Sequence, residues 1–323
     1  MNSVELTDIV KNFEINGNIL SIEPFGEGHI NTTYKVVTDK SSYILQKINS
    51  NLFTNVEALM QNIVSVTEYL KKKIIERGGD PLRESLTVIK TKDGKNYYFT
   101  GKDYFRVYIF IEGATSYQIV KNPNDFYQAA VAFGNFANLL SEFDADKLYE
   151  SIPHFHDTVK RYGDFIEAVQ KDVVGRVCEV EKEIKFVTDR KNITGKIVDK
   201  LADGTIPLKV THNDTKLNNV MIDDITGKAI CVIDLDTIMP GSILYDFGDS
   251  IRFGCNTALE DEKDLDKVDF DIDLFKTFAD GYIHSQKDSI TVKEVENLAL
   301  SAIIMTYECG MRFLADYISG DTY

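Results

Sequence analysis

The chain has 323 residues, of which 43% are hydrophobic and 27% are charged, and its formal net charge at pH 7 is −15. This composition is typical of a globular protein, and the length exceeds what one compact core normally holds, so we expect two lobes. The negative charge disfavours nucleic acid and anionic membranes as partners, and a phosphate-bearing ligand would need local cations or a metal ion to offset it.

β-Strands are predicted for most of the first hundred residues. Four segments are rich in β-branched and aromatic side chains: ILSIEPF (19–25), TTYKVVT (32–38), SYILQKI (42–48) and NYYFTG (96–101). Between the first two, FGEGHIN carries Gly26 and Gly28, and glycine lets the backbone approach a phosphate closely. On their own, the two glycines are also typical of an ordinary hairpin turn, and the chain contains no G-x-x-x-x-G-K-[ST] phosphate loop.

A helix is predicted between the third and fourth of these strands. Thr54 and Glu57 form a T-x-x-E capping box at its start. Apolar residues then recur at helical spacing: Val56, Met60, Ile63, Leu70 and Ile74. The sequence RGGDP (77–81) ends the helix with glycine and proline.

Helical patterns dominate after YFRVYIFIEG (104–113), where we expect the β-rich lobe to join a larger helical lobe. A first helix follows Asn122 and Pro123, and the last helical region begins near Leu274. Two short strand-like stretches interrupt the helices: LKV (208–210) and AICVID (229–234).

A polar cluster lies between those two stretches, in VTHNDTKLNNVMID (210–223). Asp214 and Asn219 stand five residues apart, with Lys216 between them, and the next strand ends in Asp234. A hairpin-like return of the chain would bring Asp234 beside Asp214 and Asn219. Two carboxylates and an amide oxygen suit Mg²⁺, which completes its shell with water and substrate phosphates. Each residue alone is equally typical of a turn, but the ordered set favours a metal site.

This spacing matches the catalytic loop and metal-binding aspartate of the protein-kinase-like phosphotransferases. The chain departs from protein kinases in having His-Asn-Asp in the loop, and Ile-Asp-Leu-Asp in place of Asp-Phe-Gly. These departures resemble the aminoglycoside phosphotransferase group of small-molecule kinases. Within that group, several segments resemble the N-acetylhexosamine 1-kinases: FGEGHINTTYKV (25–36), YILQKIN (43–49), IPHFHDTVKRY (152–162), HNDTKLNNVMID (212–223), VIDLDTIMPGSILYDFGDSIRFG (232–254) and CGMRFLADYISGD (309–321).

The resemblance implies a protein-kinase-like two-lobed α+β fold, with a small β-rich N-lobe and a larger, mainly helical C-lobe. Residues 1–111 would form the nucleotide-binding lobe, and residues 112–323 the catalytic and substrate-binding lobe. The implied activity is ATP- and Mg²⁺-dependent phosphorylation of the anomeric hydroxyl of N-acetylglucosamine or N-acetylgalactosamine, giving the sugar 1-phosphate. The alternatives are a related kinase for another sugar, an amino alcohol or homoserine, and a non-catalytic nucleotide-binding protein.

The resemblance also assigns roles to the polar cluster. Asp214 would be the base that orients or deprotonates the sugar hydroxyl, and Lys216 would neutralise charge on the transferring phosphoryl group. Asn219 and Asp234 would bind Mg²⁺. Asp236 is either a further metal-site carboxylate or a solvated strand end.

Nucleotide contacts are implied in the glycine-containing turn, the third strand and the connection between the lobes: Gly26, Gly28, Asn31, Gln46, Lys47, Tyr108, Ile109 and Ile111. Protein kinases carry on the third strand a lysine that grips the α- and β-phosphates. In the resemblance, Gln46 aligns with that lysine, and Lys47 is the next residue. Because neighbouring residues of a strand point to opposite faces of the sheet, the side chains of Gln46 and Lys47 would do so too. Only one of the two can therefore face the nucleotide. Glu57 is either the helix partner of such a lysine or only a capping residue.

Sugar contacts are implied for His29, Arg252, Phe253 and Arg312. An aromatic ring packs against the apolar face of a pyranose, and an arginine donates a fixed fork of hydrogen bonds to hydroxyl or acetamido oxygens. Core packing of Phe253, and an ion pair of Arg312 with Asp316 one helical turn later, are the structural alternatives. Asp246, in YDFGDS, is expected to brace the catalytic loop, because a buried carboxylate needs hydrogen-bond partners.

The sequence also bears on partners and localisation. The four cysteines form no C-x-x-C pair, which favours free thiols in a reducing compartment. The N-terminus lacks a signal-peptide pattern, and the longest apolar stretch, 298–307, is shorter than the ~20 residues of a membrane span. We therefore predict a cytoplasmic protein whose partner is a small-molecule sugar, with no nucleic-acid or membrane partner. His154 and His156 have no carboxylate beside them in the PHFH sequence, so we expect them to be structural.

Overall fold

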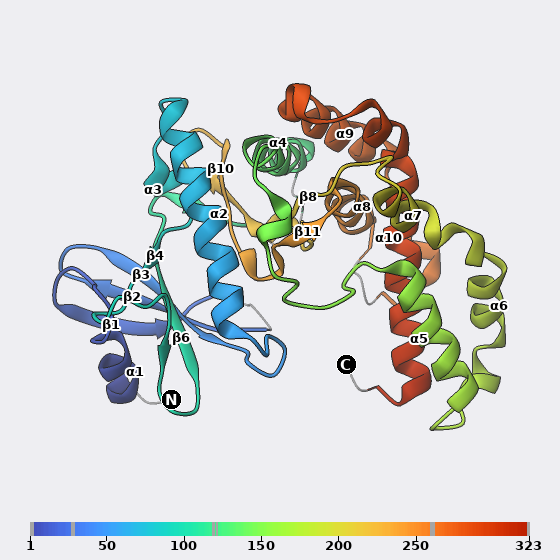
Figure 1. Ribbon diagram of the computed structural model, residues 1–323, viewed down its shortest axis with the longest axis horizontal. Helices are drawn as coiled ribbons and strands as arrows, with labels where there is room; N and C mark the ends of the chain where they lie inside the picture. Colours follow the sequence, from blue (N-terminus) through green and yellow to red (C-terminus); the bar gives the residue numbers. More distant parts are fainter. Residues whose placement is uncertain (1–2, 27–29, 118–119, 121, 259–261, 322–323) are drawn as a thin grey trace. The chain divides into compact units, whose positions relative to one another are not determined.

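The computed structural model describes residues 3–26, 30–117, 120, 122–258 and 262–321. The chain divides into two compact units, whose helices and strands are labelled in Figure 1. Unit 1 comprises Met1–Tyr117, Asp146–Ile152 and Asn218–Met239, and unit 2 comprises Gln118–Ala145, Pro153–Leu217 and Pro240–Tyr323. The fold is α+β, as predicted, because unit 1 is built on antiparallel sheets and unit 2 is mainly helical.

Unit 1 contains a six-stranded antiparallel sheet with the strand order β1-β2-β3-β6-β4, in which β5 also pairs with β6. The strands are β1 (Ile19–Pro24), β2 (Thr32–Thr38), β3 (Ser42–Ile48), β4 (Val88–Ile89), β5 (Tyr98–Phe99) and β6 (Tyr104–Ile109). β2 and β3 have the predicted bounds. The strand predicted at 96–101 is reduced to β5, and β4 was not predicted.

The two faces of this sheet differ in chemistry. One face packs against α1 (Ser3–Val10) in a buried cluster: Leu6, Ile9, Val10, Phe13, Val36, Tyr43, Leu45, Phe105 and Val107. Full burial of each large apolar side chain contributes about 1.5–3 kcal/mol. Because side chains alternate along a strand, the intervening residues point to the opposite face, among them Gln46 and Arg106. The apolar face thus holds the sheet together, whereas the other face combines apolar residues such as Ile48 and Tyr108 with the polar side chains of Gln46 and Arg106.

Helix α2 (Val56–Glu76) corrects one local prediction. Its N-cap is Asn55, whose side chain accepts a hydrogen bond from the backbone N–H of Ala58 at 3.1 Å. The predicted capping box of Thr54 and Glu57 is therefore wrong, and an asparagine is at least as good an N-cap as the neighbouring threonine. The helix ends at Glu76, directly before RGGDP (77–81), as predicted. The short helix α3 (Pro81–Glu84) follows.

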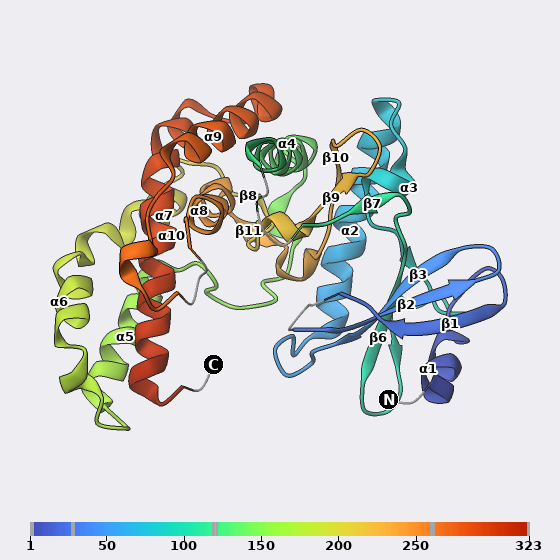
Figure 2. The ribbon, with the colours of Figure 1, turned by 180° about the vertical axis from the view of Figure 1, so that it is seen from behind.

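A second, three-stranded sheet of unit 1 is ordered β10-β9-β7. It consists of β9 (Val220–Asp223), β10 (Ala229–Val232) and β7 (Ala114–Thr115), which lie side by side in Figure 2. Ala114 pairs with Asp223, and Thr115 pairs with Ile222. Both β7 and the hairpin at 218–239 belong to unit 1, whereas the sequence prediction had placed them in the lobe that begins at residue 112.

The helices of unit 2 are α4 (Pro123–Leu139), α5 (Thr158–Lys171), α6 (Glu181–Asp189), α7 (Gly195–Ala202), α8 (Ile243–Gly254), α9 (Ile272–Gln286) and α10 (Val292–Ser319). As predicted, α4 begins at Pro123, and the side chain of Asn122 caps it by accepting from the backbone N–H of Asp125. A two-stranded sheet pairs β8 (Lys209–Thr211) with β11 (Met239–Gly241). Short 3₁₀ helices occur at Ala145–Lys147, Val177–Glu179, Lys191–Ile193, Leu217–Asn219, Leu235–Thr237, Leu265–Lys267 and Lys287–Ser289.

The 28-residue helix α10 is the structural centre of unit 2 and packs against α5, α6 and α8 (Figure 1). One buried cluster joins it to α5 and α6: Phe165, Val187, Tyr307, Met311 and Ile318. By length and composition alone, α10 is apolar enough to cross a membrane. Its packing is that of a core helix, which passes the same test of length and hydropathy.

Candidate active-site residues

The polar loop after β8 is fixed by Asp246 of α8, within unit 2. The backbone N–H groups of His212 and Asn213 donate to the two carboxylate oxygens of Asp246 at 3.0 and 2.7 Å. Asn213 adopts a left-handed conformation (φ 67°), which asparagine tolerates better than most residues. Thr215 Oγ1 donates to the backbone carbonyl of Asp246 at 2.5 Å. The expected brace is thus confirmed, and it holds the backbone on both sides of Asp214.

The side chain of Asp214 lies beside a cation and near an aromatic ring. Lys216 Nζ is 3.3 Å from Asp214 Oδ1 and 5.9 Å from the centre of the Phe253 ring, on α8. The side chains of Asp214 and Lys216 are 29% and 32% exposed, so a ligand from solvent can reach both. A proton acceptor, a cation and a ring face therefore occur together in unit 2.

The acidity of Asp246 gives a prediction about pH. Burial raises the pKa of Asp246 to about 6, although His212 and the two backbone N–H donors act in the opposite direction. Between the ordinary pKa of 3.8 and about 6, the folded chain holds this proton more tightly than the unfolded chain. The contribution of Asp246 to the free energy of unfolding should therefore fall as the pH rises through this range, by up to about 3 kcal/mol.

Urea denaturation of wild type and Asp246→Asn at several pH values from 4 to 7 measures this contribution as the difference between the two free energies of unfolding. The free energy of unfolding of wild type, minus that of the variant, should decrease as the pH rises and become constant above pH 6. A difference that shifts in favour of wild type over this range would contradict the raised pKa.

Two residues with oxygen-bearing side chains, Asn219 and Asp234, stand at the same end of the β9–β10 hairpin in unit 1. Val220 pairs with Val232, so Asn219 directly precedes one strand and Asp234 closely follows the other. The backbone N–H of Ile233 donates to the carbonyl of Asn219 at 2.9 Å. The predicted hairpin return is therefore confirmed for this pair. Asn219 is buried and Asp234 is exposed.

The donor set fits Mg²⁺, which is bound in proteins by one or two carboxylates, amide oxygens and water. In the described part of the chain, no group of three or more His, Cys, Asp or Glu side chains is placed to hold a metal ion. A site made from Asn219 and Asp234 would not form such a group, because one of its ligands is an amide. It would also leave coordination positions for water and nucleotide phosphates.

Asp236 is buried and ion-paired, so it is not a solvated strand end. It is 4% exposed, and both of its carboxylate oxygens accept hydrogen bonds from the guanidinium of Arg106. Asn31 Nδ2 donates to Asp236 Oδ2 at 2.6 Å. Arg106 was not singled out in the sequence, although an arginine within the apolar strand sequence YFRVYI is an unusual feature that could have drawn attention to it.

Gln46 and Lys47 point to opposite faces of the sheet. Gln46 accepts from Arg106 Nε at 2.9 Å and donates to Thr33 at 3.1 Å, whereas Lys47 forms an ion pair with Asp103 at 2.9 Å. Gln46 therefore shares the face of Arg106.

The other predicted nucleotide contacts are only partly described. Gly26 adopts φ 76°, a left-handed conformation that favours glycine. Tyr108 and Ile111 are buried and Ile109 is half-buried, in β6 or directly after it. Gly28 and His29 lie outside the described residues.

The predicted sugar-binding residues lie on two helices of unit 2. On α8, Nε and Nη2 of Arg252 donate to Asp249 Oδ1 at 3.0 and 2.9 Å. On α10, the guanidinium carbon of Arg312 lies 5.8 Å from the centre of the Phe155 ring. The expectation that no carboxylate lies near the two histidines is wrong, because His156 is buried with Nδ1 2.9 Å from Glu308 Oε1 and His154 Nδ1 lies 3.3 Å from Asp157 Oδ2.

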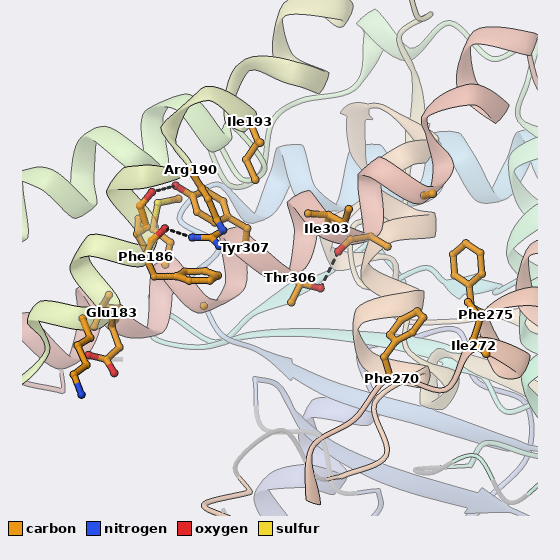
Figure 3. Close-up of a pocket in the computed structure, with 17 residues that line it drawn as sticks. Glu183, Phe186, Arg190, Ile193, Phe270, Ile272, Phe275, Ile303, Thr306 and Tyr307 are labelled. Atoms are coloured by element: carbon orange, nitrogen blue, oxygen red, sulfur yellow. Dashed lines mark hydrogen bonds between the residues drawn. The ribbon is translucent and has the colours of Figure 1, made fainter. Parts of the chain in front are cut away.

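Unit 2 contains a large apolar cavity whose lining includes Gly310, Met311 and Leu314, on either side of Arg312 in the sequence. It has a volume of about 1020 Å³ and is lined by α6, α9, α10 and neighbouring loops, with Phe186, Ile303 and Tyr307 among its walls (Figure 3). None of the residues that line it is one of the predicted catalytic or ligand-binding residues.

Comparison with known proteins supplies the family. Residues 21–266 match the sequence profile of the phosphotransferase enzyme family. An aminoglycoside phosphotransferase from Alicyclobacillus acidocaldarius is structurally similar, with a TM-score of 0.64 and 11% identity over 98% of this chain and 87% of that one. Spectinomycin phosphotransferase in complex with ADP and spectinomycin gives a TM-score of 0.57 and 15% identity, over 99% and 87% of the two chains. Amicoumacin kinase in complex with AMP-PNP and Ca²⁺ gives 0.60 and 13%, over 98% and 84%.

These similarities confirm the protein-kinase-like α+β fold. The segment that matches the family profile covers more than half of the chain and includes Asp214, Asn219 and Asp234. The chain therefore belongs to the phosphotransferase enzyme family.

Proposed function

We propose that this protein is a kinase that transfers the terminal phosphoryl group of ATP to the anomeric hydroxyl of an N-acetylhexosamine, with Mg²⁺ as cofactor. The observation that carries the proposal is the group formed by Asp214, Lys216 and Phe253 in unit 2. It combines a base for a hydroxyl, a cation for a phosphoryl group and a ring face for a sugar. We further propose that the enzyme acts in the cytoplasm on small molecules alone.

Asp214 would accept the proton of the sugar hydroxyl as the oxygen attacks phosphorus. Its carboxylate is held in place by a backbone that Asp246 fixes on both sides, so little reorganisation is needed during the reaction. Lys216, 3.3 Å away, would counter the negative charge of the transferring group. Such positioning and charge stabilisation provide most of the catalysis in phosphoryl transfer.

Asn219 and Asp234 would hold Mg²⁺, which when bound neutralises charge on the β- and γ-phosphates. Two structural relatives support a nucleotide and a divalent cation, because one binds ADP and the other binds AMP-PNP with Ca²⁺. Gln46 rather than Lys47 would face the nucleotide, since it lies on the face of the sheet that Arg106 shares.

The choice of an N-acetylhexosamine rests on residues outside the general kinase motif. Arg252, Phe253 and Arg312 occur in segments that resemble the N-acetylhexosamine 1-kinases, and Phe253 lies near the Asp214–Lys216 pair. Buried donors that pair with an acetamido group would be left unpaired by glucosamine, which lacks the acetyl group. We therefore expect strong discrimination between the two sugars.

A phosphorylation assay with N-acetylglucosamine, N-acetylgalactosamine, glucosamine, choline and kanamycin tests the acceptor. ADP release should be fastest with one of the two N-acetylated sugars, and ³¹P NMR should show the phosphate on C1. Equal rates with choline or kanamycin, or a C6 phosphate, would remove the sugar 1-kinase proposal and leave the phosphotransferase family assignment unchanged.

Replacing Arg312 by alanine in the same assay should raise the KM for the sugar far more than the KM for ATP. Arg190→Ala is the matched control, because Arg190 also lies over a phenylalanine ring of unit 2, with its guanidinium carbon 3.6 Å from the centre of Phe186. It should change neither KM. Equal effects of the Arg312 variant on both substrates would argue against a sugar contact.

A further inference from the structure

Arg106 is a buried cation in the middle of a β-strand. It is 1% exposed, and its neighbours along β6, Phe105 and Val107, belong to the apolar core on the other face of the sheet. A charge is costly to bury unless it is paired and hydrogen-bonded. The surroundings of Arg106 must therefore provide both.

The partners of Arg106 come from two separate parts of unit 1. Nε donates to Gln46 Oε1 at 2.9 Å on the adjacent strand, where the two residues are paired in register. Nη1 and Nη2 donate to the two oxygens of Asp236, with a distance of 2.9 Å for the second contact. This two-pronged contact fixes the orientation as well as the position of the Asp236 carboxylate.

Asp236 connects this arginine to Asn31, the residue directly before β2. Asn31 donates to Asp236 Oδ2 at 2.6 Å and accepts from the backbone N–H of Asn49 at 3.0 Å. The backbone carbonyl of Asp236 accepts from Ser151 Oγ at 3.1 Å. The Asp236 carboxylate therefore receives three donors, and a metal ion would have to compete with a guanidinium for it.

Asp234 stands two residues before this anchor and has a backbone that requires support. Its φ of 58° and ψ of 63° lie in the left-handed region, which aspartate adopts more readily than most non-glycine residues but which is still less favourable than the right-handed helical region. The short 3₁₀ helix Leu235–Thr237 begins directly afterwards and contains Asp236. Fixing Asp236 therefore restricts where the carboxylate of Asp234 can be.

We propose that Arg106 is a positioning residue for the metal site: through Asp236 it fixes the loop that carries Asp234, and through Asn31 it ties the start of β2 to that loop. In protein kinases the fixed cation of this region is a lysine on the third strand. In this chain Gln46 takes that place and the cation stands one strand away. The role in metal binding rests on the proposed function, whereas the role in fixing the loop does not.

Hydrogen exchange of the ligand-free protein tests the fixing of the loop. Arg106→Lys keeps the charge but loses the planar fork, so amides of residues 233–238 and 30–33 should exchange about tenfold faster or more. Helix α5 of unit 2 should exchange at the wild-type rate. Unchanged exchange at 233–238 would overturn the proposal, and this measurement needs neither nucleotide nor sugar.

Calorimetry with ATP, in Mg²⁺ and in EDTA, tests the consequence for the metal. Arg106→Lys should weaken binding in Mg²⁺ by about tenfold and leave binding in EDTA unchanged, as for other residues that orient metal ligands. If Arg106 only stabilised the fold, Arg106→Lys would lower the fraction of folded protein. The ratio of ATP affinities in Mg²⁺ and in EDTA would then stay at its wild-type value. Wild type that shows no Mg²⁺-dependent binding would count against the proposed function, not against the loop anchor.

A double variant distinguishes an anchor from a metal ligand. Arg106→Met leaves a buried carboxylate without its cation, and adding Asp236→Asn removes that charge. An anchoring role predicts that the double variant binds ATP in Mg²⁺ more tightly than Arg106→Met alone. A metal-ligand role for Asp236 predicts that it binds more weakly, and this result would overturn the proposal.

Arg83→Lys is the matched control for Arg106→Lys. Arg83 is another arginine of unit 1 that pairs with an aspartate, at 2.8 Å from Asp223, and it also donates to the carbonyl of Glu112 at 2.7 Å. It has no recorded contact with Asp236. Its replacement should alter neither exchange at 233–238 nor ATP binding in Mg²⁺, and an effect equal to that of Arg106→Lys would overturn a specific role for Arg106.

Discussion

Replacing Asp214 by asparagine is expected to lower the rate of phosphoryl transfer by about 10²–10⁴, because an amide cannot accept the proton of the acceptor hydroxyl. Asparagine keeps the size of the side chain, and Asp246 still holds the backbone on both sides of it. Binding of ATP with Mg²⁺ should therefore remain close to that of wild type. A coupled assay for ADP with the best acceptor measures the rate, and titration calorimetry measures binding.

Asp189→Asn is a suitable control for this variant. Asp189 also forms an ion pair with a lysine in unit 2, at 2.7 Å from Lys185, but it lies on the exposed surface of α6. Exposed pairs of this kind contribute little to stability, so the control should have wild-type rate and binding. Full activity of Asp214→Asn would show that another group accepts the proton.

Local sequence patterns predicted the elements whose side chains follow one clear period. β2 and β3 have their predicted bounds because they are rich in β-branched and aromatic residues, which favour strands. The cap of α2 could not be predicted with the same certainty, because threonine and asparagine, both good N-caps, stand next to each other at 54 and 55. The short β4 and β7 have two residues each, too few to establish a period.

In the candidate site too, contacts between residues close in the sequence could be predicted and contacts between distant residues could not. The spacing of Asp214, Asn219 and Asp234 is visible in the sequence, because these residues belong to one loop and one hairpin. The pairing of Arg106 with Asp236 joins residues 130 positions apart. It follows from the registration of strands and the path of the chain, which local periodicity does not determine.

In β3, the structure determines which residue lies on which face of the sheet, and the sequence alone does not. Alternation established that Gln46 and Lys47 point to opposite faces, but it could not say which face carries the polar side chains. The contacts of the two residues answer this, since Gln46 bonds to Arg106 and Lys47 bonds to Asp103. Gln46, which the sequence resemblance aligns with the kinase lysine, therefore lies next to a cation from the neighbouring strand β6.

Replacing Asp234 by asparagine is expected to weaken binding of ATP in Mg²⁺ by about 100-fold, the upper end of what residues that only orient metal ligands cause. Asparagine is the appropriate replacement because Asp234 has a φ of 58°, and asparagine tolerates this left-handed backbone better than alanine does. The variant thus removes the charge of a proposed ligand and keeps the loop in place. Titration of ATP in Mg²⁺ and in EDTA measures the effect.

The effect of Asp234→Asn on ATP binding should differ between Mg²⁺ and EDTA. Binding in EDTA should remain at the wild-type value or become tighter, because Asp234 repels a triphosphate when no metal ion lies between them. Asp224→Asn is the matched control, since Asp224 is an exposed aspartate of the β9–β10 turn whose recorded partner is Thr115, at 2.8 Å. It should bind as wild type does in both conditions.

If Asp234→Asn kept the wild-type response to Mg²⁺, the charge that binds the metal would have to come from another carboxylate. Asp236, with its oxygens already paired to Arg106, would then have to exchange a guanidinium for the metal ion when nucleotide binds.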